Sequence, residues 1–157
     1  MDKAYFMHHG IKGQKWGVRR YQNKDGTLTD LGKKRIKNSS PKIIKEAIAS
    51  GAVSAKMNSS KQERHIADKE KSLGRSIIYG DLDTAEALIK ELSCTGTPIL
   101  DSNGNWTKKE RVNADRPIGA WVPRDSGISS ETSSALIHYS NTGAHIVPAR
   151  PKENKKK

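Results

Sequence analysis

Residues 136–150 decide the fold, and they read Leu-Ile-His-Tyr-Ser-Asn-Thr-Gly-Ala-His-Ile-Val-Pro-Ala-Arg. Two runs that alternate between apolar and polar residues flank the Asn-Thr-Gly step, a pattern typical of a β-hairpin with a two-residue turn. With Thr142 and Gly143 as that turn, Ser140 lies opposite His145. The sequence therefore predicts a hairpin that brings histidines from two strands together.

The predicted register sorts the hairpin side chains onto two faces, because successive residues of a strand point in opposite directions. A three-residue loop would put the two histidines on opposite faces and bury one of them, so the apolar pattern favours the even loop. Tyr139 then pairs with Ile146. One face carries Ile137, Tyr139 and Ile146 toward a core, and the other gathers His138, Ser140 and His145.

The composition of the 157 residues predicts one small domain with an extension. Only 33% of the residues are hydrophobic and the mean hydropathy is -0.79, which excludes a large core. The sequence has neither an apolar run long enough to cross a membrane nor a secretory signal, so we expect a protein that is cytosolic at synthesis and has no membrane partner. A single cysteine, Cys94, excludes an intramolecular disulfide and a cysteine-based zinc cluster.

The net charge of +12 is unevenly distributed along the chain. Residues 1–50 hold 12 Lys and Arg against 4 Asp and Glu, residues 51–150 hold 13 against 12, and residues 151–157 hold 4 against 1. The predicted globular part is therefore nearly neutral. Bulk basicity indicates that the two ends can bind a polyanion, and chemistry on nucleic acid has to be inferred from the site itself.

Four segments follow from changes in composition. Residues 1–39 form a basic arm that is rich in glycine and poor in periodic apolar residues, and we expect this arm to be extended. Residues 40–58 are a helix and linker, residues 59–151 are the compact domain, and residues 152–157 are a disordered lysine-rich tail.

The compact domain is expected to be of the α+β class, with a small antiparallel β-sheet packed by one or two helices. A capping box formed by Asp83 and Glu86 predicts the start of an amphipathic helix. Ser40 and Pro41 predict the start of the preceding helix. Strands are predicted at residues 76–79, 98–100, 106–112 and 118–122, followed by the closing hairpin.

Three histidines and one arginine supply the groups that metal-free RNA cleavage needs. The ordinary pKa of histidine, about 6.5, lets one ring take a proton from the ribose 2′-hydroxyl while another gives one to the departing 5′-oxygen. The planar guanidinium of Arg75 matches two phosphate oxygens at once. The candidate catalytic residues are His65, Arg75, His138 and His145, and the candidate substrate-binding residues are Lys61, Ser76, Ser140 and Thr142.

Two other chemistries would use the same residues. Ser140 beside His145 would suit a serine hydrolase, but the sequence has no Gly-x-Ser-x-Gly elbow. His65, His138 and His145 would suit a zinc site, since three imidazoles with an open position make a catalytic centre, yet their spacing matches no metal signature. We therefore favour acid–base catalysis without a metal or cofactor.

Several motifs lie between residues 61 and 153. They are Lys-Gln-x-x-His-Ile at 61–66, Gly-Arg-Ser-Ile at 74–77, Gly-Thr-Pro at 96–98, Ile-Gly at 118–119, and Ile-His-Tyr-Ser-x-Thr-Gly-x-His-Ile-Val-Pro-Ala-Arg-Pro-Lys at 137–152. With these motifs the stretch resembles the polymorphic toxin type 50 domain. Members are regarded as ribonuclease toxins of the barnase–EndoU–colicin–RelE type, so the resemblance implies that fold, metal-independent RNA cleavage and a cognate immunity protein. It points to the same candidate residues, with Lys61 and Pro148 flanking the other seven, and does not settle which histidine is the base and which the acid.

The amino-terminal segment carries a second resemblance. Residues 8–29 read His-His-Gly-Ile-Lys-Gly-x-Lys-Trp-Gly-Val-Arg-Arg-Tyr-Gln-Asn-x-Asp-Gly-Thr-Leu-Thr, which is similar to a segment of phage and prophage head-associated proteins of Gram-positive bacteria. This resemblance implies that residues 1–39 dock on phage particle proteins. Together the two resemblances predict a prophage-encoded ribonuclease effector that acts on RNA in the cytoplasm of a bacterial host and travels with the virion.

Two non-enzymatic hypotheses remain open at this point. One is a phage structural or adaptor protein whose domain binds RNA or a host protein without cleaving it. The other is an inhibitor of a host defence nuclease that presents the same surface as a decoy.

Overall fold

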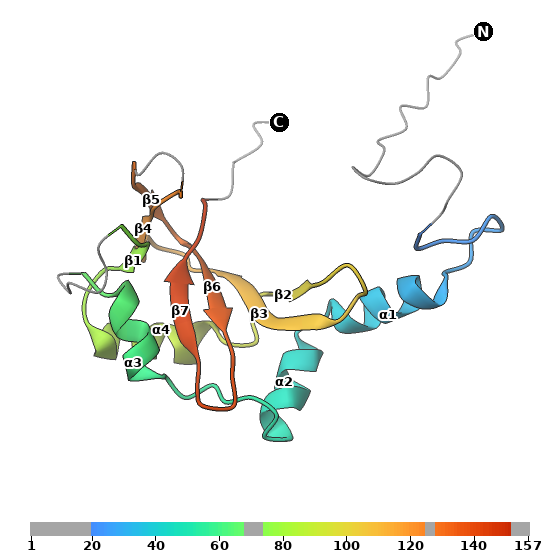
Figure 1. Ribbon diagram of the computed structural model, residues 1–157, viewed down its shortest axis with the longest axis horizontal. Coiled ribbons are helices and arrows are strands. Elements are labelled where there is room, and N and C mark those ends of the chain that lie inside the picture. Colours follow the sequence, from blue (N-terminus) through green and yellow to red (C-terminus); the bar gives the residue numbers. More distant parts are fainter. Residues whose placement is uncertain (1–19, 68–73, 125–127, 152–157) are drawn as a thin grey trace, which may run out of the picture.

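Two small antiparallel sheets organise the chain (Figure 1). The computed structural model describes residues 20–67, 74–124 and 128–151. The first sheet has the order β1-β4-β5, formed by Ile77–Ile78, Gly119–Trp121 and Ser130–Thr132. The second has the order β2-β3-β6-β7, formed by Thr97–Leu100, Trp106–Asn113, Ser134–His138 and His145–Pro148. The helices are α1 (Asp30–Asn38), α2 (Lys42–Ala49), α3 (Ser59–Gln62), the 3₁₀ turn η1 (Glu63–His65) and α4 (Leu82–Leu92).

This architecture confirms the predicted α+β class. It contains two sheets, whereas we expected a single sheet. The sequence did not predict the sheet that contains β5, because the three residues of this strand, Ser-Glu-Thr, show no apolar alternation. The three-stranded sheet can form because Gly119 lets β4 approach β1 and β7 closely. A Cβ atom on Gly119 would lie 2.2 Å from the carbonyl oxygen of Ile77 and 2.9 Å from Cγ of Pro148.

Helix α4 covers one face of the four-stranded sheet, and this packing forms the core. Its buried residues recur at helical spacing and lie in the same cluster as the inward side chains of β6 and β7. The helix begins at Leu82, so Asp83 is not the cap that we predicted. Asp81 is the N-cap because its carboxylate accepts from both the backbone N–H (2.9 Å) and the hydroxyl (2.8 Å) of Thr84.

The β6–β7 hairpin forms with an even loop, but its register differs by two residues from the predicted one. His138, and not Ser140, lies opposite His145, and Ile137 lies opposite Ile146. The turn is closed by Ser140 and Gly143, whose backbone groups bond each other at 3.1 and 3.3 Å. A shift of two residues leaves every side chain on its expected face. The predicted apolar face is confirmed, with Ile137, Tyr139 and Ile146 all buried.

Residues 54–58 explain why the turn closes where it does. This segment runs alongside the tip of the hairpin, where the Ala144 N–H donates to the carbonyl of Lys56 (2.7 Å) and the Asn58 N–H donates to the carbonyl of Ala144 (2.7 Å). Gly143 has a φ of +125°, and a Cβ atom there would lie 2.8 Å from the oxygen of Lys56. Only glycine fits this position without strain.

The buried side chain of Gln62 joins helix α3 to the free edge of β7. Its Nε2 donates to the carbonyl of Ile146 (3.0 Å), and its Oε1 accepts from the N–H of the same residue (2.8 Å). One amide side chain thus takes the place of a neighbouring strand. Asn58 caps α3 by accepting from the N–H of Lys61 (3.0 Å), so the start of this helix coincides with the boundary that we placed between residues 58 and 59.

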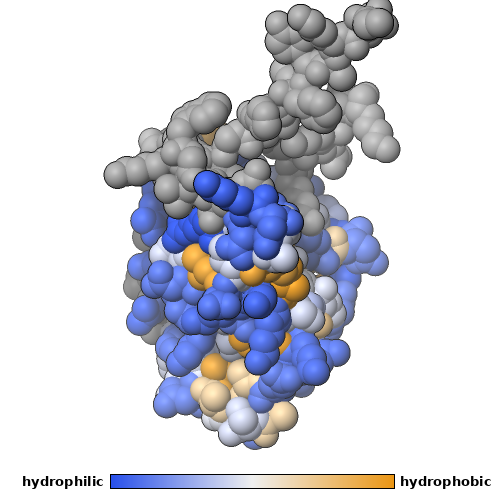
Figure 2. All heavy atoms as spheres, turned by 90° about the vertical axis from the view of Figure 1, so that its right-hand side faces the viewer, coloured by the Kyte–Doolittle hydropathy of each residue, from blue (hydrophilic) through white to orange (hydrophobic). Residues whose placement is uncertain are grey.

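Helix α1 lies inside the segment that we expected to be extended. Thr29 caps it by accepting from the N–H of Gly32. Arg35 donates to the carbonyl of Asp101 (3.0 Å) and Asn38 to that of Gly104 (2.8 Å), so α1 is docked on the turn between β2 and β3. Figure 2 shows that this end of the molecule is mainly hydrophilic, with hydrophobic side chains in small separate patches.

The remaining predictions for the two ends concern residues 1–19 and 152–157, which lie outside the described residues. Within the described residues, the helices are too short and too polar for any of them to cross a membrane.

Replacement of Gln62 by leucine should destabilise the protein strongly. The substitution leaves the buried N–H and C=O of Ile146 without partners, and each such group costs about 1–3 kcal/mol, so we expect a loss of about 2–5 kcal/mol in the free energy of unfolding, measured by urea denaturation. Gln22→Leu is the matched control, because Gln22 is exposed and its amide makes one local bond to Gly26. Equal effects of the two substitutions would contradict this account.

Candidate active site

The outward face of the four-stranded sheet carries a row of basic side chains. In the observed register Lys109 of β3 pairs with His138 of β6, and His138 pairs with His145 of β7. The ring centroids of the two histidines are 4.8 Å apart. Because Ile137 and Ile146 point into the core, their neighbours His138 and His145 must point to the opposite side, away from α4.

A third imidazole, that of His65, completes the row from outside the sheet. The ring stacks on His145 with a centroid distance of 6.0 Å and an interplanar angle of 14°. His65 is the last residue of η1, and η1 directly follows Gln62. The bonds from Gln62 to β7 therefore hold the His65 ring beside the sheet. Three histidines that are distant in the sequence are therefore neighbours in the fold.

The tautomer of His65 is fixed by Ser76. Nδ1 of His65 lies 2.8 Å from the carbonyl oxygen of Ser76, and a carbonyl can only accept, so Nδ1 carries the hydrogen. Nε2 is then the ring atom left for a substrate. The Ser76 hydroxyl accepts from the N–H of Val122 (3.0 Å), the residue that follows β4. This bond ties Ser76, and with it the carbonyl that accepts from His65, to the end of β4.

The three rings open into a groove of about 680 Å³ between the two sheets. None of the described residues that line it is an aspartate or a glutamate, although the globular part of the chain is nearly neutral. The groove therefore has a positive potential that favours an anionic ligand. Its lining residues are His65, Ser76, Lys109, Arg111, Trp121, Val122, Pro123, Arg124, Leu136, His138, His145, Val147, Pro148, Ala149 and Arg150.

Burial lowers the pKa of all three histidines, and repulsion from neighbouring basic groups adds to this effect, so the neutral form of each ring is favoured in the free protein. Burial is the main cause that lowers the pKa of His138 to about 4, with added repulsion from Lys109 and His65. Burial also lowers the pKa of His145 to about 4, with repulsion from His138 and His65. The pKa of His65 is lowered mainly by burial, and the bond to the Ser76 carbonyl opposes that shift.

The predicted substrate-binding residues divide into two groups. Ser76 lines the groove, whereas Lys61, Ser140 and Thr142 are absent from its lining. Nζ of Lys61 donates to the Ser140 hydroxyl (3.3 Å), which itself donates to the carbonyl of Gly143 (2.7 Å), so these residues fasten the hairpin turn. The hydroxyl of Thr142 lies 3.1 Å from that of Ser140 and belongs to the same cluster.

Arg75 is exposed and does not line the groove, although its charge contributes to the lowered pKa of His65. The arginine and lysine beside the histidines are Arg111 and Lys109, which our sequence reasoning did not select. A signal for them exists, because they lie two residues apart on a predicted strand and so share a face. Gln62 and Trp121 were also missed, since no local pattern identifies the contacts they make.

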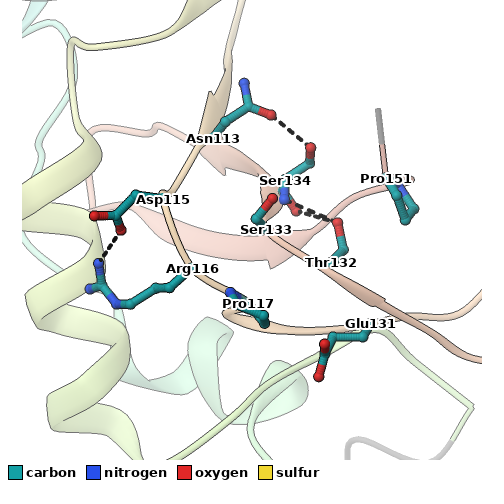
Figure 3. Close-up of a pocket in the computed structure, with 9 residues that line it drawn as sticks. All are labelled: Asn113, Asp115, Arg116, Pro117, Glu131, Thr132, Ser133, Ser134 and Pro151. Atoms are coloured by element: carbon teal, nitrogen blue, oxygen red, sulfur yellow. Dashed lines mark hydrogen bonds and ion pairs between the residues drawn. The ribbon is translucent and has the colours of Figure 1, made fainter. Parts of the chain in front are cut away.

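A second cavity, of about 510 Å³, lies near the other end of β6 (Figure 3). Figure 3 shows its polar side chains bonded to one another: Ser134 donates to Asn113 (2.7 Å), and Arg116 pairs with Asp115 (3.0 Å). It has no histidine among its described lining residues. It therefore lacks the acid–base groups that distinguish the groove.

In the described part of the chain, no group of three or more His, Cys, Asp or Glu is arranged to hold a metal ion.

The α+β architecture, with its two small antiparallel sheets and its helices, is consistent with a small barnase-like toxin fold. Comparison with protein families agrees: residues 57–148 match the family described as Bacterial toxin 50. The match covers more than half of the chain, which therefore belongs to this toxin family, as its motifs indicated. A search of the curated proteins found no match.

The lowered histidine pKa values make the stability of the fold depend on pH. The pKa of His138 is about 4 in the folded state and about 6.5 when unfolded, so the unfolded state binds more protons between these values and stability falls as the pH falls from 6.5 toward 4. The same holds for His145. We expect His138→Gln to lose less stability than wild type between pH 7 and pH 4.5 in urea unfolding. An identical pH dependence in both proteins, or a His138 ring that titrates near 6.5 by NMR, would contradict this prediction.

Proposed function

We propose that this toxin domain is a metal-independent endoribonuclease that cleaves RNA by attack of the ribose 2′-hydroxyl on the adjacent phosphate. The observation that carries the proposal is the row of three neighbouring imidazoles in a cationic groove whose described lining has no carboxylate. Acid–base groups supply proton transfer, and the cations suit a polyanionic substrate.

The proposed reaction has one bond-forming and one bond-breaking event at phosphorus. The 2′-oxygen attacks phosphorus, and its proton passes to a neutral imidazole. The bond from phosphorus to the 5′-oxygen breaks, and an imidazolium gives a proton to the departing oxygen. The products are a 2′,3′-cyclic phosphate and a 5′-hydroxyl end, and the enzyme regains its starting charge when the two imidazoles exchange the proton through solvent.

We assign the acid to His65 and the base to the pair of His138 and His145. The Ser76 carbonyl accepts from Nδ1 of His65 at 2.8 Å and stabilises the charged ring, leaving Nε2 to donate to the leaving oxygen. His138 and His145 repel a proton from each other, and their pKa of about 4 keeps both neutral and able to accept one.

We assign the electrostatic role to Lys109 and Arg111, in place of the exposed Arg75. Both line the groove on the strand next to His138. Nη2 of Arg111 donates to the carbonyl of Arg150 (2.6 Å), which fixes the plane of its guanidinium. Fixed donors aimed at a phosphate stabilise the charge that grows on its oxygens in the transition state.

The purified protein should cleave RNA in the presence of EDTA and leave 2′,3′-cyclic phosphate ends. His145→Ala should lower the rate by about 10²–10⁴-fold, the range for loss of an acid or base. Gel analysis of a labelled RNA with end-group mapping makes the measurement. Lys90→Gln is the control, because Lys90 is an exposed residue of α4, on the other face of the sheet.

Intact RNA with a protein whose circular dichroism confirms folding would refute catalysis and favour the adaptor hypothesis. Activity that returns only with added zinc would favour the three-imidazole metal site instead.

The assignment of His65 as the acid predicts a rescue by the leaving group. A ribonucleoside 3′-(4-nitrophenyl) phosphate releases a phenolate that needs no proton, so His65→Ala should slow its cleavage less than about tenfold while slowing RNA cleavage about 10²–10⁴-fold. His145→Ala should slow both substrates alike, because both need a base. A comparable loss with both substrates for His65→Ala would show that His65 is not the acid.

The biological setting is part of the same proposal. Its proposed partners are RNA, phage particle proteins contacted by residues 1–39, and a cognate immunity protein of the kind that typically accompanies toxin domains. The proposed place of action is the cytoplasm of a bacterial host, with delivery on the virion.

A further inference from the structure

The indole of Trp121 is an aromatic side chain in the lining of the groove that has no role in proton transfer or charge stabilisation. Trp121 ends strand β4, two residues after Gly119, and therefore points to the same side of the strand as Gly119. That side faces β7, since a Cβ atom on Gly119 would lie 2.9 Å from Cγ of Pro148. Trp121 and Pro148 both line the groove, with Val147 beside them.

Trp106 and Trp121 differ in their contacts: Trp106 packs against the core cluster, and Trp121 is not among the residues that do so. The indole N–H of Trp106 donates to the carbonyl of Lys109 (2.8 Å), and its ring tilts against that of Tyr139 at 5.8 Å. Trp121 is half-buried, and within the described part of the chain its indole N–H has no hydrogen-bond partner and its ring has no aromatic neighbour.

The backbone next to Trp121 is tied to the histidines. The N–H of the following residue, Val122, donates to the hydroxyl of Ser76, and the carbonyl of Ser76 accepts from His65. The backbone that carries the indole is thus linked to the His65 ring through one serine. A ligand group that rests on Trp121 is held at a set place beside the imidazoles.

We propose that Trp121 is the stacking platform for a nucleobase of a single-stranded substrate in the groove. An aromatic face beside Lys109, Arg111 and three histidines matches a ligand that combines an anion with a flat ring, which is the chemistry of a nucleotide. A duplex does not expose a base face for such contact, so the platform selects unpaired RNA. The proposal rests on the proposed function for the identity of the strand, and it assigns Trp121 to substrate specificity.

The test separates stacking from charge with uncleavable probes. Two dye-labelled tetramers are used, one a 2′-O-methyl oligonucleotide with four bases and the other its abasic counterpart with the same phosphates. Neither can be cleaved, since the first lacks a 2′-hydroxyl and the second is made with the same blocked position. Dissociation constants come from fluorescence anisotropy with the full chain.

Wild type should bind the base-containing tetramer about 5- to 150-fold more tightly than the abasic one, the range for one stacked base. Trp121→Leu should lose most of that preference and bind the abasic tetramer as wild type does, and Trp121→Phe should keep most of it. Tyr79→Leu is the matched control, because Tyr79 is an exposed aromatic residue that does not line the groove.

A preference that survives in Trp121→Leu, or an equal loss of affinity for both tetramers, would overturn the platform, and Trp121→Phe guards against a misfolded leucine variant. The two proposals fail separately. A protein that shows the Trp121-dependent preference but leaves natural RNA intact has the platform without the ribonuclease activity. One that cleaves RNA but shows no such preference has the activity without the platform.

Discussion

The bonds between the Gln62 side chain and the backbone of Ile146 are the constraint on which the groove depends. They close the open edge of β7, which would otherwise present unpaired groups. They also set the distance at which η1 runs beside the sheet, and so bring the His65 ring within 6.0 Å of His145. Without them, two histidines on a hairpin would remain, and His65 would be held through its bond to Ser76 but no longer through β7.

The charge of the groove follows from the two-residue period of β3. Lys109 and Arg111 point outward, and Glu110 between them points into the core. There its carboxylate accepts from the backbone N–H of Cys94 (3.0 Å) and Gly96 (2.6 Å) and from the hydroxyl of Tyr139 (2.6 Å). The domain is nearly neutral, but the groove is cationic because the carboxylate of this strand, that of Glu110, is buried on the opposite face, where it stabilises the core.

The sequence predicted the parts of the site that depend on local pattern. Alternation and an even turn were sufficient to put His138 and His145 on one face, even with the register two residues away, since only parity decides the face. The exact register could not be predicted, because residues 54–58 fix it from more than eighty positions away. For the same reason Gln62 and Trp121 were missed: their function arises from contacts between elements that are distant along the chain. His65 was selected because few histidines were available and because the motifs resemble the toxin family, since no local pattern would have joined it to the hairpin.

The groove has one property that neither its residues nor their spacing shows alone. Burial, with added repulsion from neighbouring basic groups, lowers the pKa of His138 and His145 to about 4, so the empty groove disfavours a protonated imidazole. A phosphodiester brings the opposite charge and reverses that repulsion, which raises the histidine pKa values on binding. Under the proposed mechanism, binding of the substrate thus favours the protonated imidazole that later donates a proton to the leaving oxygen. In the charged state His65 has an acceptor for its second N–H, the carbonyl of Ser76, which agrees with its assignment as the acid.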